Sequence, residues 1–127
     1  MFEDHNRERA KAGVGTLTLN AGLTEVARER ARDMARNNYF AHVSPTGEDA
    51  FSTLKTHGIT YWSAGANIAM NTYSNAEAVE TAMTGFMESP AHKENLLDAD
   101  YELIGVGVAI DGDKKYFCVI FTGFLLP

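Results

Sequence analysis

Two apolar segments near the C-terminal end, joined by a short polar turn, constrain the fold more than any other part of the sequence. Branched apolar side chains alternate with small residues over 103–110, and the second segment covers 116–124. The Asp-Gly-Asp tripeptide at 111–113 is typical of a tight hairpin turn. The pattern predicts an antiparallel β-hairpin. Gly105 and Gly107 leave one face of its first strand nearly bare, so a helix or a ligand can approach that backbone closely.

The segments before the hairpin show mainly helical spacing of apolar residues. Thr24 is a suitable cap for the longest of them, and Ser74 with Glu77 forms a capping-box sequence before another. Ser89 followed by Pro90 favours the start of a further short helix. We predict helices at 2–12, 23–37, 49–57, 74–87 and from residue 90 onward, and a strand around 64–70.

Helices that precede an antiparallel hairpin favour an α+β fold, in which helices cover a sheet, over a doubly wound βαβ fold. The 127 residues, of which 45% are apolar, are enough for one compact core, and we expect 1–127 to form a single domain. No apolar run reaches the roughly 20 residues that a transmembrane helix needs. We therefore expect no transmembrane segment, and we find no signal-peptide pattern.

Charge is distributed unevenly along the chain. Residues 1–36 contain seven basic and six acidic side chains, whereas 37–127 contain four basic and eleven acidic ones. So acidic a segment repels phosphate, and we expect no nucleic-acid partner. In the predicted helix at 23–37 we expect solvated ion pairs, at helical spacing, between three arginines and three acids: Arg28, Arg32 and Arg36 with Glu25, Glu29 and Asp33.

Two histidines have matching sequence contexts. His42 precedes and His92 follows a Ser-Pro dipeptide, and functional groups are often presented by turns of this kind. Each imidazole also has a structural interpretation, in which its two nitrogens tie neighbouring loops together. His5, in a charged helix, and His57, at a helix end, are interpreted as structural.

Several other side chains have both a functional and a structural interpretation. Ser44 and Ser89 lie near the histidines, but a serine before proline suits a turn or a helix cap. The single cysteine, Cys118, is expected to be a buried packing residue. Four aromatic residues either line an apolar groove or pack in the core: Tyr39, Phe40, Tyr61 and Trp62. Three acidic residues either attract calcium or form a solvated loop: Asp98, Asp100 and Glu102.

Four longer segments follow one another in a recognisable order: NYFAHVSPTG at 38–47, GANIA at 65–69, SPAHKENLL at 89–97 and IGVGV at 104–108. Together they resemble the bacterial branch of the CAP superfamily, which comprises the cysteine-rich secretory, antigen-five and pathogenesis-related proteins. This branch is also known as the SCP-like extracellular domain. Asn6, Arg9 and Met34 fit the same pattern, and the resemblance covers nearly the whole chain.

The resemblance implies a three-layer α-β-α sandwich with a central antiparallel sheet, in an extracellular or cell-envelope setting. In family members with a complete cleft, two histidines and two glutamates converge, and some of these proteins bind zinc or another divalent cation there. Family activities include binding of sterols or lipids, antagonism of protein partners and, in a few members, proteolysis. The fold alone therefore does not select one activity.

His42 and His92 match the two cleft histidines of the family. The first cleft glutamate belongs to a Gly-Glu-Asn motif, but this sequence has Ala66 in its place. The second falls at about Ser89, with Glu88 one residue away. Since adjacent helical residues point about 100° apart, Glu88 substitutes only if the helix turns it toward the cleft.

A metal ion held by two imidazoles alone is weakly bound, since zinc sites use three or four protein ligands. We therefore expect a non-catalytic module whose cleft around His42 and His92 binds a lipid, peptide, cell-wall or protein ligand. Asn67 and Ser89 would orient the cleft walls, and zinc or another divalent cation would be held weakly at most. The alternative is a metal-assisted hydrolase of peptides or cell-wall material, with Glu88 as general base. A purely structural domain is the third possibility.

Overall fold

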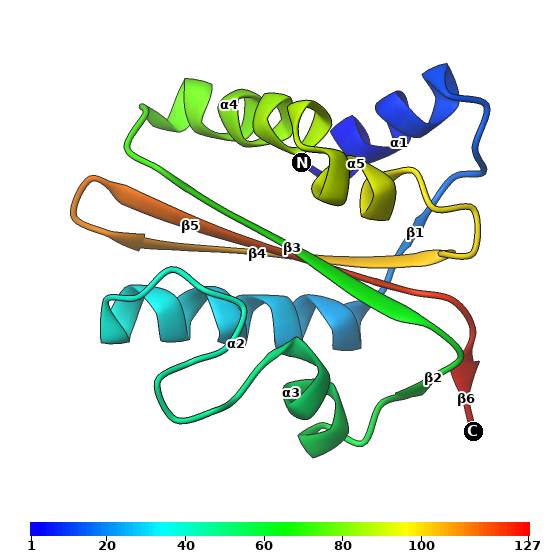
Figure 1. Ribbon diagram of the computed structural model, residues 1–127, viewed down its shortest axis with the longest axis horizontal. Coiled ribbons are helices and arrows are strands. Elements are labelled where there is room, and N and C mark those ends of the chain that lie inside the picture. The colour runs from blue at the N-terminus through cyan, green and yellow to red at the C-terminus, as the bar shows by residue number, and fades with distance from the viewer.

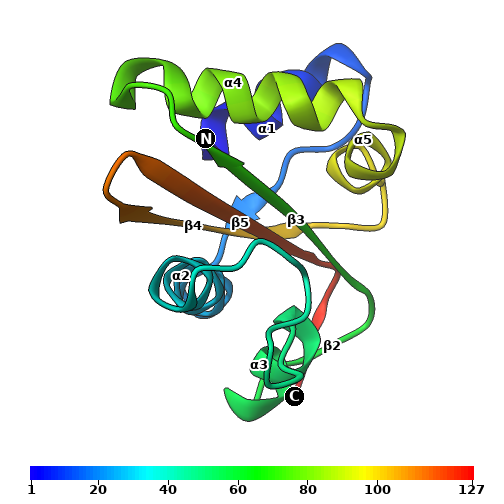
Figure 2. The same cartoon turned by 60° about the vertical axis from the view of Figure 1, so that its left-hand side comes forward.

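A sheet lies between two layers of helices in the computed structural model, which describes all residues 1–127 (Figure 1). The helices are α1 (Phe2–Lys11), α2 (Ala21–Asn37), α3 (Ala50–Thr56), α4 (Asn75–Glu88) and α5 (Pro90–Leu96). The strands are β1 (Thr18–Leu19), β2 (Thr60–Tyr61), β3 (Ala64–Asn71), β4 (Leu103–Asp111), β5 (Lys114–Thr122) and β6 (Leu125–Leu126). Helices α1, α4 and α5 lie on one side of the sheet, and α2 and α3 lie on the other (Figures 1 and 2). The α+β class and the α-β-α layering are thus confirmed.

The main sheet has the strand order β1-β4-β5-β3, and β2 and β6 form a separate two-stranded ribbon. Strands β4 and β5 are the predicted hairpin, and β3 pairs with β5 in antiparallel orientation at one edge. Strand β1 is parallel to β4, so the sheet is antiparallel except at this short strand. The second hairpin strand ends at Thr122, earlier than predicted, although the N–H of Gly123 still bonds to the carbonyl of Ser63 before β3.

The two glycines of β4 let α2 rest directly on the sheet. A Cβ atom on Gly105 would lie 2.2 Å from the carbonyl carbon of Leu23, and one on Gly107 would lie 2.3 Å from the amide nitrogen of Arg28. No side chain fits in these spaces. The element that approaches the bare face of β4 is therefore a helix, α2, and not a ligand.

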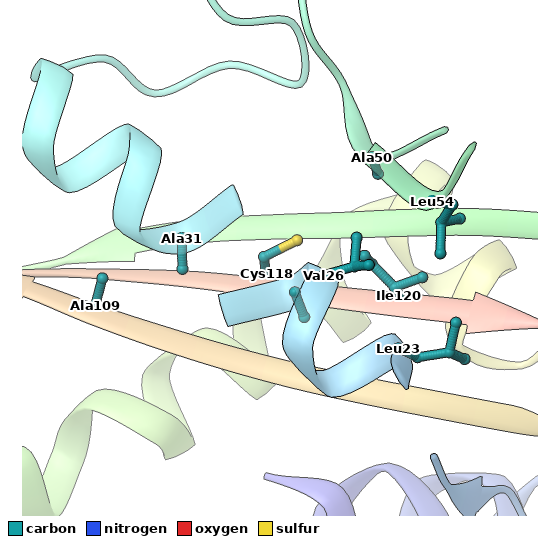
Figure 3. Close-up of a cluster of buried hydrophobic side chains, with 9 residues drawn as sticks. Leu23, Val26, Ala31, Ala50, Leu54, Ala109, Cys118 and Ile120 are labelled. Carbon is teal, nitrogen blue, oxygen red and sulfur yellow. The ribbon is translucent and has the colours of Figure 1, made fainter. Parts of the chain in front are cut away.

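The two largest apolar clusters hold the layers together, one on each side of the sheet. The cluster on the α2 side, drawn in Figure 3, consists of Leu23, Val26, Ala27, Ala31, Ala50, Leu54, Ala109, Cys118 and Ile120. Cys118 is only 1% exposed, which confirms its packing role, and burial raises the pKa of its thiol to about 12. The opposite cluster consists of Leu17, Met83, Phe86, Leu96, Tyr101, Ile104, Val119 and Phe121.

A buried arginine ties α1 to the loop that follows α5. The guanidinium of Arg9 donates hydrogen bonds to four backbone carbonyls, those of Gly15, Leu96, Asp98 and Tyr101. The amide of Asn6 adds a reciprocal pair of hydrogen bonds with the backbone of Leu17. These contacts fix the end of α5 and with it the position of His92.

The N-terminal caps of three helices differ from the predicted ones. The first turn of α2 is capped by Asn20, not Thr24, because β1 ends there: the N–H of Asn20 bonds to Ile104 and its side chain accepts from Leu23. Ser74 makes no side-chain cap on α4, whereas Asp49 and Ser52 form an unpredicted capping box on α3. No helix combines the length and apolarity needed to cross a membrane.

The predicted ion pairs along α2 are not formed. Arg28, Arg32 and Arg36 are exposed, and no carboxylate lies within ion-pair distance of any of them. Two of the acids that were expected as partners make other contacts. Glu29 lies 2.7 Å from Nε2 of His57 after α3, and Asp33 bonds to Asn37 and Tyr39. Glu29 thus contacts the end of α3, and Asp33 contacts Tyr39 in the loop after α2 as well as residues of α2 itself.

Candidate functional site

The two histidines lie on either side of the edge strand β3. His42 belongs to the loop between α2 and α3, and His92 belongs to α5; Figure 2 shows these two segments on opposite sides of β3. Each histidine lines its own groove. One groove, of about 330 Å³, includes His42 and residues 64–66, and the other, of about 240 Å³, includes His92 and residues 68–71.

His92 is held firmly by its neighbours. Its Nδ1 lies 2.7 Å from the hydroxyl oxygen of Ser89, and its ring stacks on Phe86 with centroids 5.5 Å apart. Ser89 is the N-cap residue of α5, as predicted, but its side chain makes no cap bond and contacts the imidazole of His92 instead. With Nδ1 engaged, Nε2 is the nitrogen left for a ligand.

A pair of asparagines fixes α5 against β3. Asn67, which is 1% exposed, donates from Nδ2 to the carbonyl oxygen of His92 at 2.9 Å. Asn95 donates to the side-chain oxygen of Asn67 at 3.0 Å and to the carbonyl oxygen of Ala66 at 3.3 Å. Asn67 therefore positions the helix that contains His92. Asn95 completes the network, although the sequence analysis assigned it no role.

The loop that contains His42 is anchored on α2. Arg30 donates to the hydroxyl oxygen of Tyr39 at 2.6 Å, and that hydroxyl donates to Asp33. Burial, aided by the bond to Asp33, raises the pKa of Tyr39 to about 12. Ser44 is buried, and its hydroxyl oxygen accepts the N–H of Glu48. Ser44 is therefore a turn residue and not a nucleophile.

His42 itself remains accessible but is partly desolvated. This desolvation lowers its pKa, the neighbouring His92 lowers it further, and Asp49 acts in the opposite direction. Asp49 is the one carboxylate that lines a groove together with either histidine, and it already caps α3. Ala66 lies in the same groove as His42, so the missing family glutamate would have projected beside that histidine.

Glu88 does not join the histidines. It is exposed and lines a different groove between α1 and α4, together with Arg7, Val79 and Met83. The helix thus turns Glu88 away from the face that presents Ser89 and His92. This placement removes the support for Glu88 as a general base in a histidine cleft.

The donor set does not fit a zinc centre. Nowhere in the chain do three or more His, Cys, Asp or Glu side chains form a group that could hold a metal ion. Zinc sites in proteins need three or four such ligands, and the two histidines supply two imidazole nitrogens at most. The acidic residues near 98–102 do not provide such a group either; Asp98 bonds instead to the N–H of Asp100 as part of the loop.

The aromatic residues have separate roles. Phe40 is 48% exposed and lines the groove of His92. Tyr39 is engaged in the hydrogen bonds to α2, and Tyr61 packs against the core cluster on that side. Trp62 is exposed between β2 and β3 and lines neither groove. Phe86, which the sequence analysis did not single out, supplies the groove wall beneath His92.

Comparison with known proteins supports the family and the fold. Residues 2–122 match the family model CAP, the cysteine-rich secretory protein family. The uncharacterized protein YkwD of Bacillus subtilis is 37% identical over 107 residues, which are 84% of this chain and 40% of YkwD. The uncharacterized membrane protein YlbC of the same organism is 37% identical over 109 residues, which are 86% of this chain and 29% of YlbC. The chain thus spans less than half the length of these two relatives.

A solved structure agrees with these matches. The crystal structure of an extracellular protein containing an SCP domain from Bacillus anthracis has a TM-score of 0.80 and 28% sequence identity to this chain. The match covers 97% of this chain and 39% of the other. The α-β-α arrangement is therefore shared with a protein of known structure.

Proposed function

Because this chain belongs to the CAP family of cysteine-rich secretory proteins, we propose that it is a non-catalytic binding module of an extracellular or cell-envelope protein. Its ligand occupies the grooves beside β3, around His42 and His92. Residues 1–127 act as one domain in this proposal. The extracellular setting is supported by the SCP-domain protein of Bacillus anthracis, whose description places it outside the cell.

The observation that carries the proposal is the way His92 is held. Its Nδ1 contacts a serine hydroxyl and its ring stacks on a phenylalanine, whereas a catalytic imidazole is usually oriented by a carboxylate or a metal ion. The surrounding groove contains apolar and aromatic side chains with a few polar groups, the composition expected of a ligand site. These features favour binding over turnover.

The hydrolase alternative has less support. Hydrolysis at a metal centre needs a coordinated water and a general base nearby. The alanine at position 66 and the placement of Glu88 leave neither histidine groove with a free carboxylate, since Asp49 is engaged as a helix cap. Any divalent cation at His42 and His92 is therefore weakly held and is not required for ligand binding.

A two-part experiment tests the proposal. The protein is incubated with proteome-derived peptides and with peptidoglycan, with zinc or with EDTA, and new termini and released fragments are measured by mass spectrometry. We expect no turnover. Cleavage that disappears in His92→Ala, or on chelation, would contradict the proposal and favour the hydrolase.

The second part measures retention of the protein on immobilised peptides, peptidoglycan and phosphatidylglycerol vesicles. We expect at least one of these materials to retain it, and Phe40→Ala to lower retention about tenfold because Phe40 lines the groove. Phe124→Ala is the matched control, since Phe124 is 66% exposed and lines neither groove. Equal retention of both variants, or no retention at all, argues against a binding module.

A further inference from the structure

The outer edge of β3 carries backbone groups that point away from the sheet. The carbonyl oxygen of Ala66 accepts from Asn95, which lies outside the sheet, whereas the carbonyl of Ser63 bonds to Gly123 at the β5 side. In an antiparallel strand the N–H and C=O groups of one residue point to the same side, and the side alternates along the strand. Ala64, Ala66, Ile68 and Met70 therefore direct their backbone groups outward.

Almost all of these outward groups lack a protein partner. Strand β3 pairs only with β5, and the bond from Asn95 to Ala66 is the one side-chain contact made to its outward backbone. Natural proteins protect such edges with charged residues, prolines or a covering element. The sequence of β3, AGANIAMN, contains none of these protective residues. The edge is thus open over most of its length.

The two histidine grooves lie one after the other along this edge. The groove at residues 64–66 has mixed walls, with the polar side chains of His42, Asp49 and Asn95 beside the apolar side chain of Phe51. The groove at residues 68–71 has apolar walls that include Phe40 and Phe86. The strand has 8 residues and so extends over about 27 Å. A ligand that fills both grooves must be long and must run parallel to the strand.

We propose that the ligand is an extended peptide segment of another protein, which adds to the free edge of β3 as a further strand. Its main chain bonds to the outward groups of Ala64, Ile68 and Met70, and side chains along it enter the two grooves. This inference rests on the proposed function and specifies the ligand class. Strand addition of this kind derives affinity from main-chain bonds and specificity from the pockets.

The charge and shape of the grooves define the peptide further. The two grooves contain one carboxylate, that of Asp49, and no lysine or arginine, so a neutral or basic peptide is favoured. An apolar side chain suits the groove of Phe40 and Phe86, and a polar one suits the groove of Asp49. Proline is excluded at peptide positions whose N–H faces β3.

Backbone methylation of selected peptides tests the inference directly. Random peptides of about twelve residues, enough to span the edge, are selected on the immobilised protein. Each residue of a selected peptide is then N-methylated in turn. We expect methylation to weaken binding about tenfold at every second residue and to have little effect at the residues between. A peptide held only through its side chains gives no such alternation, and that result would overturn strand addition.

A variant of the edge provides the matching test on the protein side. Met70→Pro removes an outward N–H that β5 does not use, and Met70→Ala is the control for loss of the side chain. We expect Met70→Pro to bind the selected peptide at least about tenfold more weakly than Met70→Ala, with both folded by circular dichroism. Equal affinity of the two folded variants contradicts the proposal. If the proline variant does not fold, the methylation scan decides.

The outcomes separate this inference from the proposed function. If peptides bind but methylation shows no alternation, strand addition is wrong and the binding module stands. If no peptide binds more tightly than about 1 mM while retention on peptidoglycan or vesicles depends on Phe40, the ligand is not a peptide. If the free protein forms a dimer that Met70→Pro abolishes, the occupant of the edge is a second copy of the chain and the inference is overturned.

Discussion

The hydroxyl oxygen of Ser89 lies 2.7 Å from Nδ1 of His92, in the first turn of α5. A serine at the start of a helix usually bonds to a backbone N–H of the first turn. Here it bonds to an imidazole three residues later and holds the ring against Phe86. The contact determines both the orientation of the ring and which nitrogen a ligand can reach.

Replacing Ser89 by alanine should release the ring of His92. We expect the ¹⁵N shifts of the His92 imidazole to move toward those of a tautomer mixture, because Nδ1 loses its partner. Affinity for a groove ligand should fall several-fold, whereas the free energy of unfolding should change by about 1 kcal/mol or less. Ser52→Ala, which removes a capping contact on α3, is the control. Unchanged imidazole shifts in Ser89→Ala would show that the contact does not orient the ring.

His5 should make stability depend on pH. It is fully buried, contacts Phe86 and Phe121, and burial lowers its pKa from 6.5 to about 4. The unfolded chain therefore binds this proton more readily than the folded one. The contribution of neutral His5 to the free energy of unfolding is fully present above pH 6.5. It is lost as the pH falls toward 4, which lowers the free energy of unfolding by up to about 3 kcal/mol.

Urea denaturation at several pH values between 4 and 7.5 measures this loss. His5→Leu cannot be protonated at this position, so its free energy of unfolding should fall less steeply over the same range. The difference between the two pH profiles is the contribution of His5. Parallel profiles would assign the acid sensitivity to other groups.

Arg9→Lys should destabilise the protein strongly. The guanidinium of Arg9 satisfies four buried or partly buried carbonyls, and an ammonium group cannot reach all of them at once. We expect the free energy of unfolding to fall by about 2–4 kcal/mol, measured by urea denaturation. Arg7→Lys is the control because Arg7 is exposed and pairs only with Asp4, and it should change stability by less than about 0.5 kcal/mol. Similar losses in both variants would contradict the role assigned to Arg9.

Gly105→Ala should separate α2 from the sheet or prevent folding. The added Cβ would lie 2.2 Å from the carbonyl carbon of Leu23, where backbone and not a flexible side chain must move. We expect a loss of about 3 kcal/mol or more, or an insoluble product. Gly85→Ala is the control, since open space surrounds that position in α4, and it should be neutral or stabilise by about 1 kcal/mol. A stable, native-like Gly105→Ala protein would contradict the close packing.

Zinc titration by calorimetry should distinguish weak binding by two histidines from a zinc site with a full set of ligands. With two imidazoles and no third ligand, we expect the metal-free protein to bind zinc with a dissociation constant of about 0.1 mM or weaker. Ala66→Glu adds a carboxylate on the groove wall of His42 and should bind about tenfold more tightly or better. The double variant His42→Ala/His92→Ala should not bind. Nanomolar affinity of the unmodified protein for zinc would contradict our conclusion that its side chains do not form a zinc centre.

The sequence determined the main elements of this protein because their signals are local. Alternation around Gly105 and Gly107 predicted the hairpin, helical spacing predicted the helices, and four ordered motifs indicated the family. Residue spacing within one element decides its type, and glycine without a side chain decides where another backbone can lie. Both properties can be read from the local sequence, without knowing what packs against the element.

Only the tertiary structure decided which groups meet. Asn20 replaced Thr24 as the cap because β1 ends there, and Glu88 faces α1 because α4 turns it away from His92. The open edge of β3 exists because the chain places this strand outside β5 and adds no strand beyond it. Such contacts join residues far apart in the sequence, and their formation depends on how the layers pack, which no local pattern records.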